Sequence, residues 1–301
     1  MKNLAMPFIN ANQLTKRTVS EFYDTLFSRP LKTQVLADDN EKFDGDGIAL
    51  LINDEVRGLY TYRAFASLQA NTSLYYPYGG MLVADLHTTH HKELIQALFK
   101  QLKTNSTVQI IICLEQQPMQ ASSEMTKEHE FWFALGFSKL DVQVFYQGKV
   151  DVNLPRNQSD FSIARYEGGD RIINTELCDL YREAYKKRQG IPDISDESIE
   201  KQLSIPSCSY LILRHNKALI GQVTLFLSSK ECYVDSIYIK RKYWGTGAAD
   251  VLGQSLLDYA KNHDCDIVSG TAASNNWGSR RLMERFGLVA QHQAIRMVLT
   301  L

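Results

Sequence analysis

Apolar residues recur along the chain in two patterns, one typical of strands and one typical of helices. Both halves of the chain show these patterns in the same succession. The first half has strand-like runs and one helical spacing of apolar residues, at 48–52, 59–64, 80–85, 94–102 (the helical one) and 108–114. The second half has a run that ends at Ile239, a helical spacing that begins after Gly247, and further runs at 210–213, 222–227 and 266–270. This alternation of periods predicts an α/β fold with a mixed sheet.

Further correspondences indicate that the fold is repeated. A polar turn at 53–58 has a counterpart at 216–221, the segment 131–137 has one at 282–288, and each half ends in a strand, at 142–147 and 295–301. Because these segments recur in one order, the sequence predicts two tandem domains, 1–150 and 151–301. The polar stretch 148–160 is the expected linker. One larger α/β domain with coincidental hairpins is the alternative.

Composition narrows the class of protein without identifying it. Apolar residues make up 44% of the chain and charged residues 22%, which predicts a packed, soluble protein. The net charge of −1 argues against a nucleic-acid partner, and the longest apolar runs are too short to span a membrane. The N-terminus lacks the apolar core of a signal peptide, and five scattered cysteines indicate reduced thiols. We therefore expect a cytoplasmic protein, either a monomer or a homodimer.

A basic turn with two glycines follows the strand that ends at Ile239. It reads Lys240-Arg241-Lys242-Tyr243-Trp244-Gly245-Thr246-Gly247 and leads into a helix at Ala248. A helix N-terminus offers unpaired N–H groups and a favourable dipole to an anion, and glycine lets a phosphate approach the backbone closely. The turn matches neither GxxxxGK[ST] nor GxGxxG, because Asp250 occupies the third glycine position of the latter. The sequence thus predicts a phosphate cradle of another type.

Two segments resemble motifs of the GCN5-related N-acetyltransferase (GNAT) family. The stretch Lys242–Gly247 resembles the family's pyrophosphate-binding motif, with Lys242 in the usual Gln/Arg place, and Asn276–Leu288 is similar to its second motif. The resemblance covers residues 160–301 and implies a mostly antiparallel twisted sheet flanked by helices. It also implies acetyl-CoA as the acyl donor, no metal, and direct transfer of the acetyl group to a primary amine of a small molecule or peptide.

The same resemblance assigns residues to the coenzyme. Main-chain groups of the strand around Ile237 and Ile239 would pair with pantetheine, and the amides of Trp244 through Ala248 would hold the pyrophosphate. Lys242 would lie near a phosphate, or it is an ordinary solvated lysine. The full set is Ile237, Tyr238, Ile239, Lys242, Tyr243, Trp244, Gly245, Thr246, Gly247, Ala248, Asn276 and Ser279.

The catalytic groups are less well defined. Glu231 and Asp235 are the candidates for the general base, because a carboxylate in a partly dry cleft has a raised pKa that suits a base. Each has a structural alternative, as a strand-opening residue and as a hydrogen-bonding residue respectively. The family's usual tyrosine acid is replaced by Met283. A non-catalytic module that binds coenzyme A or another protein is therefore the alternative function.

The acceptor is expected to contact elements that precede this strand. The helical segment 177–190 and the acidic loop 193–200 are the candidates, and the acidic side chains could attract a cationic amine. The alternative for the acidic loop is a capped helix start at Ser195.

The first half lacks the glycines of the turn. Its corresponding residues are 85–91, with Thr89 and His91 at the glycine positions, and Met125 stands in place of Asn276. We therefore expect only the second half to bind the coenzyme. The spacing of His87, His90 and His91 is compatible with a metal, but a solvated helix start is the prediction because further ligands are missing.

Overall fold

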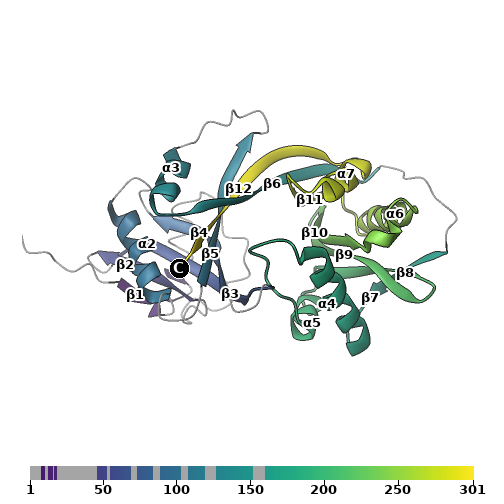
Figure 1. Cartoon of the computed structure of the whole chain (residues 1–301), viewed down its shortest axis with the longest axis horizontal. Helices are drawn as coiled ribbons and strands as arrows, with labels where there is room; N and C mark the ends of the chain where they lie inside the picture. Colours follow the sequence, from purple (N-terminus) through teal and green to yellow (C-terminus); the bar gives the residue numbers. More distant parts are fainter. Residues whose placement is uncertain are drawn as a thin grey trace, which may run out of the picture. The chain divides into compact units, whose positions relative to one another are not determined.

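The computed structural model describes residues 8–10, 13–15, 17–18, 46–52, 55–68, 73–83, 89–102, 108–118, 127–151 and 160–301 (Figure 1). All structural statements below concern these residues. The chain divides into two compact units. The first comprises Met1–Ile112 with Val298–Leu301, and the second comprises Cys113–Met297.

The first unit contains a sheet and a helix that packs against it. Its elements are β1 (Phe8–Asn10), β2 (Asp46–Ile52), β3 (Glu55–Ala66), β4 (Ser73–Val83), α2 (Thr89–Leu102) and the start of β5 (Val108–Pro118). Neighbouring strands pair antiparallel from β1 to β4, whereas β4 and β5 are parallel and are connected through α2. The helix buries Leu94, Ile95 and Leu98, which have the expected helical spacing.

The second unit contains the remaining helices and a larger sheet. In chain order its elements are α3 (Lys127–Ala134), β6 (Ser138–Lys149), β7 (Phe161–Tyr166), α4 (Arg171–Tyr185), α5 (Asp196–Leu203), β8 (Cys208–His215), β9 (Ala218–Ser228), β10 (Glu231–Ile239), the 3₁₀ turn η3 (Arg241–Tyr243), α6 (Ala248–Asn262), β11 (Ile267–Ala273), α7 (Trp277–Arg285) and β12 (Val289–Thr300). The strands are neighbours in the order β12-β6-β11-β10-β9-β8-β7. The observed fold confirms the predicted mixed α/β class with helices flanking a sheet.

Two apolar cores lie on opposite faces of this sheet, because α4 and α5 cover one face and α6 the other (Figure 1). The α6 core includes Leu252, Leu256 and Phe286. At Gly253 the packing leaves no room for a side chain, since a Cβ built there would lie 2.0 Å from Phe286 Cε1. The α4 and α5 core includes Tyr238 and Leu180. Strand β10 therefore contributes side chains to both cores.

Strand β6 shows a feature that the division into halves did not predict. It pairs antiparallel with β11, from Gln143 opposite Ala273 to Lys149 opposite Ile267, and it lies between β11 and β12. Its Val144 and Tyr146 side chains belong to the core that α6 covers. The last strand of the first half of the sequence is thus part of the second unit, and residues 148–149 of the expected linker are strand. The proposed boundary between 150 and 151 remains a prediction about domains.

The predicted turns are partly described. Asn216 and Lys217 connect β8 to β9 with positive φ angles of 49° and 67°, typical of a tight hairpin, whereas residues 218–221 of the predicted turn are the start of β9. Residues 53–54, 84–88 and 119–126 lie outside the described residues, so His87 and Met125 stay predictions, whereas Thr89 and His91 lie in the first turn of α2. Residues 152–159 of the expected linker are likewise not described.

Candidate active site

A gap opens between the two parallel strands in the middle of the second unit. Strands β10 and β11 pair only from Glu231 opposite Ile267 to Val234 opposite Gly270. The register of β10 against β9 then shifts between Val234 and Ser236, which marks a bulge at Asp235. Beyond it, β10 stays paired with β9 and β11 with β6. The facing edges of β10 and β11 are therefore separate beyond this point.

The backbone of β10 presents polar groups to this gap. The Lys240 amide donates to Ile220 O on β9 over 2.8 Å, and groups that face one neighbour alternate along an antiparallel strand. Lys240 and Tyr238 hence direct their main-chain groups to β9, while Ile239 and Ile237 direct theirs towards β11. An extended ligand that enters the gap would meet the N–H and C=O groups of Ile237 and the N–H group of Ile239, whereas Ile239 O already accepts from Trp244 Nε1.

The glycine turn exposes amides at the start of α6. Gly245 and Gly247 have φ angles of 79° and 88°, which glycine adopts without strain, and Gly247 caps α6 without any side-chain hydrogen bond. Within residues 160–301, no acceptor is bonded to the amides of Gly245, Gly247, Ala248 and Ala249. A helix N-terminus with free amides is suited to an anion such as a pyrophosphate. Ala249, which the sequence did not single out, belongs to this set.

Trp244 connects the turn to the gap. Its indole Nε1 donates to Ile239 O over 2.9 Å, although 61% of the residue is exposed. The same ring lies close to the start of α7, because a Cβ built at Gly278 would be 3.6 Å from Trp244 Cη2. Trp244 thus covers the turn, and its indole donates a hydrogen bond to a main-chain carbonyl that faces the gap.

Other predicted coenzyme residues support the turn and α7. The Lys242 ammonium lies 5.1 Å from the centroid of the Tyr243 ring, and Thr246 Oγ1 donates to Tyr243 O over 2.8 Å. Asn276 caps α7, since its Oδ1 accepts from the Ser279 amide over 3.2 Å and its Nδ2 donates to Ser279 Oγ over 2.8 Å. These contacts give the residues structural roles, and their contact with a coenzyme stays a prediction.

The two candidate bases occupy different places on β10. Glu231 lies where β10 and β11 are still paired, and it accepts a hydrogen bond from the Ser269 hydroxyl. Asp235 lies at the bulge where the gap opens, and its side chain is exposed. Nevertheless the surrounding protein limits its hydration and raises the pKa of its carboxyl group. Asp235 thus lies nearer than Glu231 to the unpaired part of β10, and the role of either carboxylate as a base stays a prediction.

Aromatic side chains surround this part of β10. Tyr185, the last residue of α4, packs edge-on against Tyr238 with ring centroids 5.1 Å apart. The Tyr238 hydroxyl is buried and has no hydrogen-bond partner among the described residues. Burial raises the pKa of Tyr185, and the neighbouring Asp235 charge adds to this effect. Tyr185 was not predicted individually, because only the fold brings the end of α4 next to β10.

Met283 lies close to the point where the gap begins. The residue is 2% exposed. A Cβ built at Gly270 of β11 would lie 3.2 Å from Met283 Cε and 3.2 Å from Val234 Cβ. Its thioether has no proton to donate. The structure therefore offers no acid at this position.

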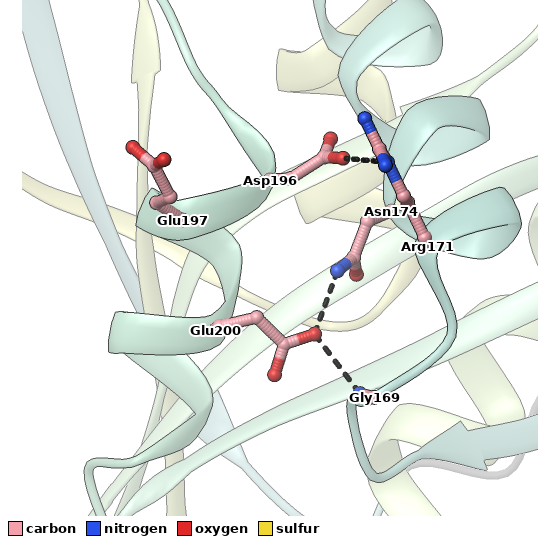
Figure 2. A pocket seen from close by; sticks show the side chains of 6 residues that line it. All are labelled: Gly169, Arg171, Asn174, Asp196, Glu197 and Glu200. Atoms are coloured by element: carbon pink, nitrogen blue, oxygen red, sulfur yellow. Dashed lines mark hydrogen bonds and ion pairs between the residues drawn. The ribbon is translucent and has the colours of Figure 1, made fainter.

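A shallow pocket lies at the other end of α4 (Figure 2). It is lined by Gly169, Arg171, Asn174, Asp196, Glu197 and Glu200. Glu200 accepts from Asn174 Nδ2 over 2.6 Å and from the Gly169 amide over 2.9 Å, and these bonds lower the pKa of its carboxyl group. The pocket groups thus hold α4 and α5 together.

The acidic loop also has a structural explanation. Ser195 and Ser198 form a reciprocal capping box at the start of α5, as the capping alternative predicts. In the same loop, Asp193 accepts from Arg182 Nε over 3.0 Å.

The cysteines in the described ranges are core residues. Four cysteines are free and buried, and burial raises the pKa of Cys208 and Cys232 to about 12, which suits small core residues rather than nucleophiles. Among the described residues, no cluster of His, Cys, Asp and Glu could hold a metal ion. No helix in the described ranges is long and apolar enough to cross a membrane.

Comparison with known proteins relates this site to a family. Residues 174–288 match the model of the acetyltransferase (GNAT) family. These residues include β10, the glycine turn, α6 and α7, and therefore the whole gap. A search of curated proteins finds no match.

Solved structures share the fold over nearly the whole chain. One is a tandem GNAT protein from the clavulanic acid biosynthesis pathway, with a TM-score of 0.69, 10% identity and 98% of both chains covered. Another is a GCN5-related N-acetyltransferase from Sphaerobacter thermophilus, with a TM-score of 0.65, 11% identity, and 98% of this chain and 97% of that chain covered. A probable N-acyltransferase from Enterococcus faecalis V583 has a TM-score of 0.63 and 10% identity, and the match covers 98% of this chain and 72% of that chain. At these identities the likeness concerns the fold.

Proposed function

Because residues 174–288 form a domain of the acetyltransferase (GNAT) family, we propose that the chain is an N-acetyltransferase that uses acetyl-CoA. The acceptor is a primary amine of a small molecule or peptide, and the acetyl group passes to it directly. The observation that carries this proposal is the gap between β10 and β11, which ends at a helix N-terminus with free amides. One extended ligand with a phosphate at one end fits both features.

The residues present suit the parts of coenzyme A. The amides of Gly245, Gly247, Ala248 and Ala249 provide donors for the pyrophosphate, with Lys242 as a nearby cation. The main-chain groups of Ile237, and those of Ile239 once Trp244 Nε1 releases Ile239 O, would pair with the pantetheine amides, as in strand addition. Bound in this way, pantetheine would run along β10 from the turn towards the bulge at Asp235. The thioester would then lie beside Asp235.

Asp235 would act as the general base. Its raised pKa brings the carboxylate closer to the pKa of an amine, and its accessibility allows the acceptor to approach. After Asp235 removes a proton, the amine nitrogen attacks the thioester carbonyl carbon. The C–N bond forms and the C–S bond breaks. The nitrogen still carries one proton more than an amide and releases it to water, and the sulfur leaves as a thiolate that takes a proton from water. Main-chain N–H groups of β10 would stabilise the carbonyl oxygen as it gains charge.

The absence of a proton donor at Met283 is compatible with this scheme. An alkyl thiol such as cysteine has a pKa of about 8.5, so a thiolate can leave without prior protonation. We expect slower transfer than with an acid in place, and rates that depend on the amine.

Turnover assays test the function. Purified protein and acetyl-CoA are incubated with spermidine, lysine, glucosamine, tyramine and a short peptide, and released thiol is measured. We expect thiol release with at least one amine, at a rate that falls about 100-fold or more in Asp235→Asn. Glu231→Gln, which changes the alternative carboxylate, is the control and should retain most of the activity. Equal loss in both variants would remove Asp235 from the assigned role.

A second candidate function is a module that binds coenzyme A without catalysis. The burial of Met283 in the core at the usual tyrosine position favours it. Calorimetric binding of acetyl-CoA together with no thiol release on any amine would support this function over the enzyme.

A further inference from the structure

A carboxylate from the first half of the sequence lies among residues of the second. Asp141 on β6 accepts from Arg296 Nε and Nη2 of β12, each over 2.7 Å, and from Arg188 Nη2 over 2.9 Å. Gln143 Nε2 donates a further bond over 3.0 Å. The side chains of Asp141, Arg188 and Arg296 are 10%, 25% and 12% exposed, so little water competes for these bonds.

The carboxyl group of Asp141 is ionised at neutral pH. Burial by itself raises its pKa, but the hydrogen bond and the charge of Arg296, together with the bonds from Gln143 and Arg188, hold the pKa below its usual value. A charged, nearly buried carboxylate with four hydrogen bonds fixes the positions of its donors.

Arg188 extends this arrangement to the aromatic side chains beside β10. Its guanidinium lies 5.5 Å from the centroid of the Tyr185 ring, a cation–π geometry. Tyr185 in turn packs against Tyr238, which lies on the part of β10 that is not paired with β11. The contacts thus run from Asp141 through Arg188 and Tyr185 to the strand that carries Asp235.

We propose that Asp141 is a positioning residue for the acceptor side of the site, where it holds Arg188 over Tyr185 and so fixes the end of α4 against β10. This inference rests on the proposed function for its consequence in catalysis. The first half of the sequence then takes part in the site through β6, although it lacks the glycine turn. The coenzyme side, formed by the turn and α6, does not depend on Asp141.

Variants of the full chain test the proposal. Asp141→Asn leaves two guanidinium groups without their carboxylate, which can prevent folding. Arg188→Met is therefore the second variant, because it keeps Asp141 paired with Arg296. Arg214→Met is the matched control: Arg214 is 24% exposed and pairs with Glu176, which also lies on α4 but far from Tyr185.

The first measurement is hydrogen–deuterium exchange, which needs no acceptor. We expect amides of residues 181–190 and 235–239 to exchange at least fivefold faster in Arg188→Met, and in Asp141→Asn if it folds. Arg214→Met should leave these segments unchanged. Unchanged exchange at 181–190 in Arg188→Met would overturn the proposal, as would an equal increase in the control.

The second measurement separates the two substrates. With the amine from the turnover panel that gives the highest rate, the KM for the amine should rise about fivefold or more in Arg188→Met, while the KM for acetyl-CoA stays within twofold. A merely structural defect would raise both KM values, and that result would refute the positioning role. If the unaltered protein acetylates none of the amines, the proposed function fails, and the exchange experiment still decides whether Asp141 and Arg188 hold Tyr185 in place.

Discussion

Adding a single methyl group at Gly245 should weaken the binding of acetyl-CoA much more than it lowers the stability of the fold. Gly245 has a φ angle of 79°, and a Cβ built there meets no atom within 4 Å. Gly245→Ala therefore costs only backbone strain, about 1 kcal/mol, which corresponds to a fall in Tm of about 2–4 °C. In the free protein the new methyl group would point into open space.

The effect on acetyl-CoA should be larger than this strain. If the pyrophosphate accepts hydrogen bonds from the free amides of the turn, the methyl group prevents at least one of these bonds. A hydrogen bond to a charged group contributes about 1.5–3 kcal/mol, so we expect Kd to rise roughly 10- to 150-fold. Isothermal titration calorimetry with acetyl-CoA measures this change directly.

Gly169 provides a matched control. Its φ angle is 80°, and a Cβ built there also meets nothing within 4 Å, but it lies before α4 and outside the glycine turn. Gly169→Ala should lose similar stability and bind acetyl-CoA with unchanged Kd. If Gly245→Ala binds as tightly as the unaltered protein, the turn is not the pyrophosphate site. Equal weakening in both variants would point to a general effect on the fold.

Three other changes have expected outcomes that follow from the geometry. Gly253→Ala forces a Cβ to within 2.0 Å of the Phe286 ring and should destabilise the protein by about 1–3 kcal/mol in denaturant unfolding, whereas Gly278→Ala, with its nearest neighbour at 3.6 Å, should be nearly neutral. The pKa of Asp235 is raised and the base must be deprotonated, so kcat/KM should rise with pH through that raised pKa. If the pH profile of kcat/KM for Asp235→Asn kept the same rise at low pH, Asp235 would not be the base. Pantetheine that pairs with the β10 main chain would compete with the indole of Trp244, so acetyl-CoA should change the tryptophan emission, and Trp244→Phe should abolish that signal; an unchanged signal in this variant would assign it to another tryptophan.

Local features of the site could be predicted from the sequence because neighbouring residues determine them. Two glycines close together adopt positive φ angles between β10 and α6, and Asn276 caps the next helix three residues before Ser279. The periods of apolar residues similarly indicated the strands and helices around the turn. Such features depend on conformational preferences and hydrogen bonds within a few residues, and these are present in the sequence itself.

The tertiary structure alone decided how distant segments meet. Nothing in the sequence indicates that β6 lies between β11 and β12, or that Asp141 bonds to Arg188 and Arg296, 47 and 155 positions away. Strand order and the pairing of buried charges depend on the free energy of packing the whole unit, to which no short segment contributes enough to be recognised alone. The sequence therefore determined a cradle suited to a phosphate, and the fold decided which side chains surround the rest of the site.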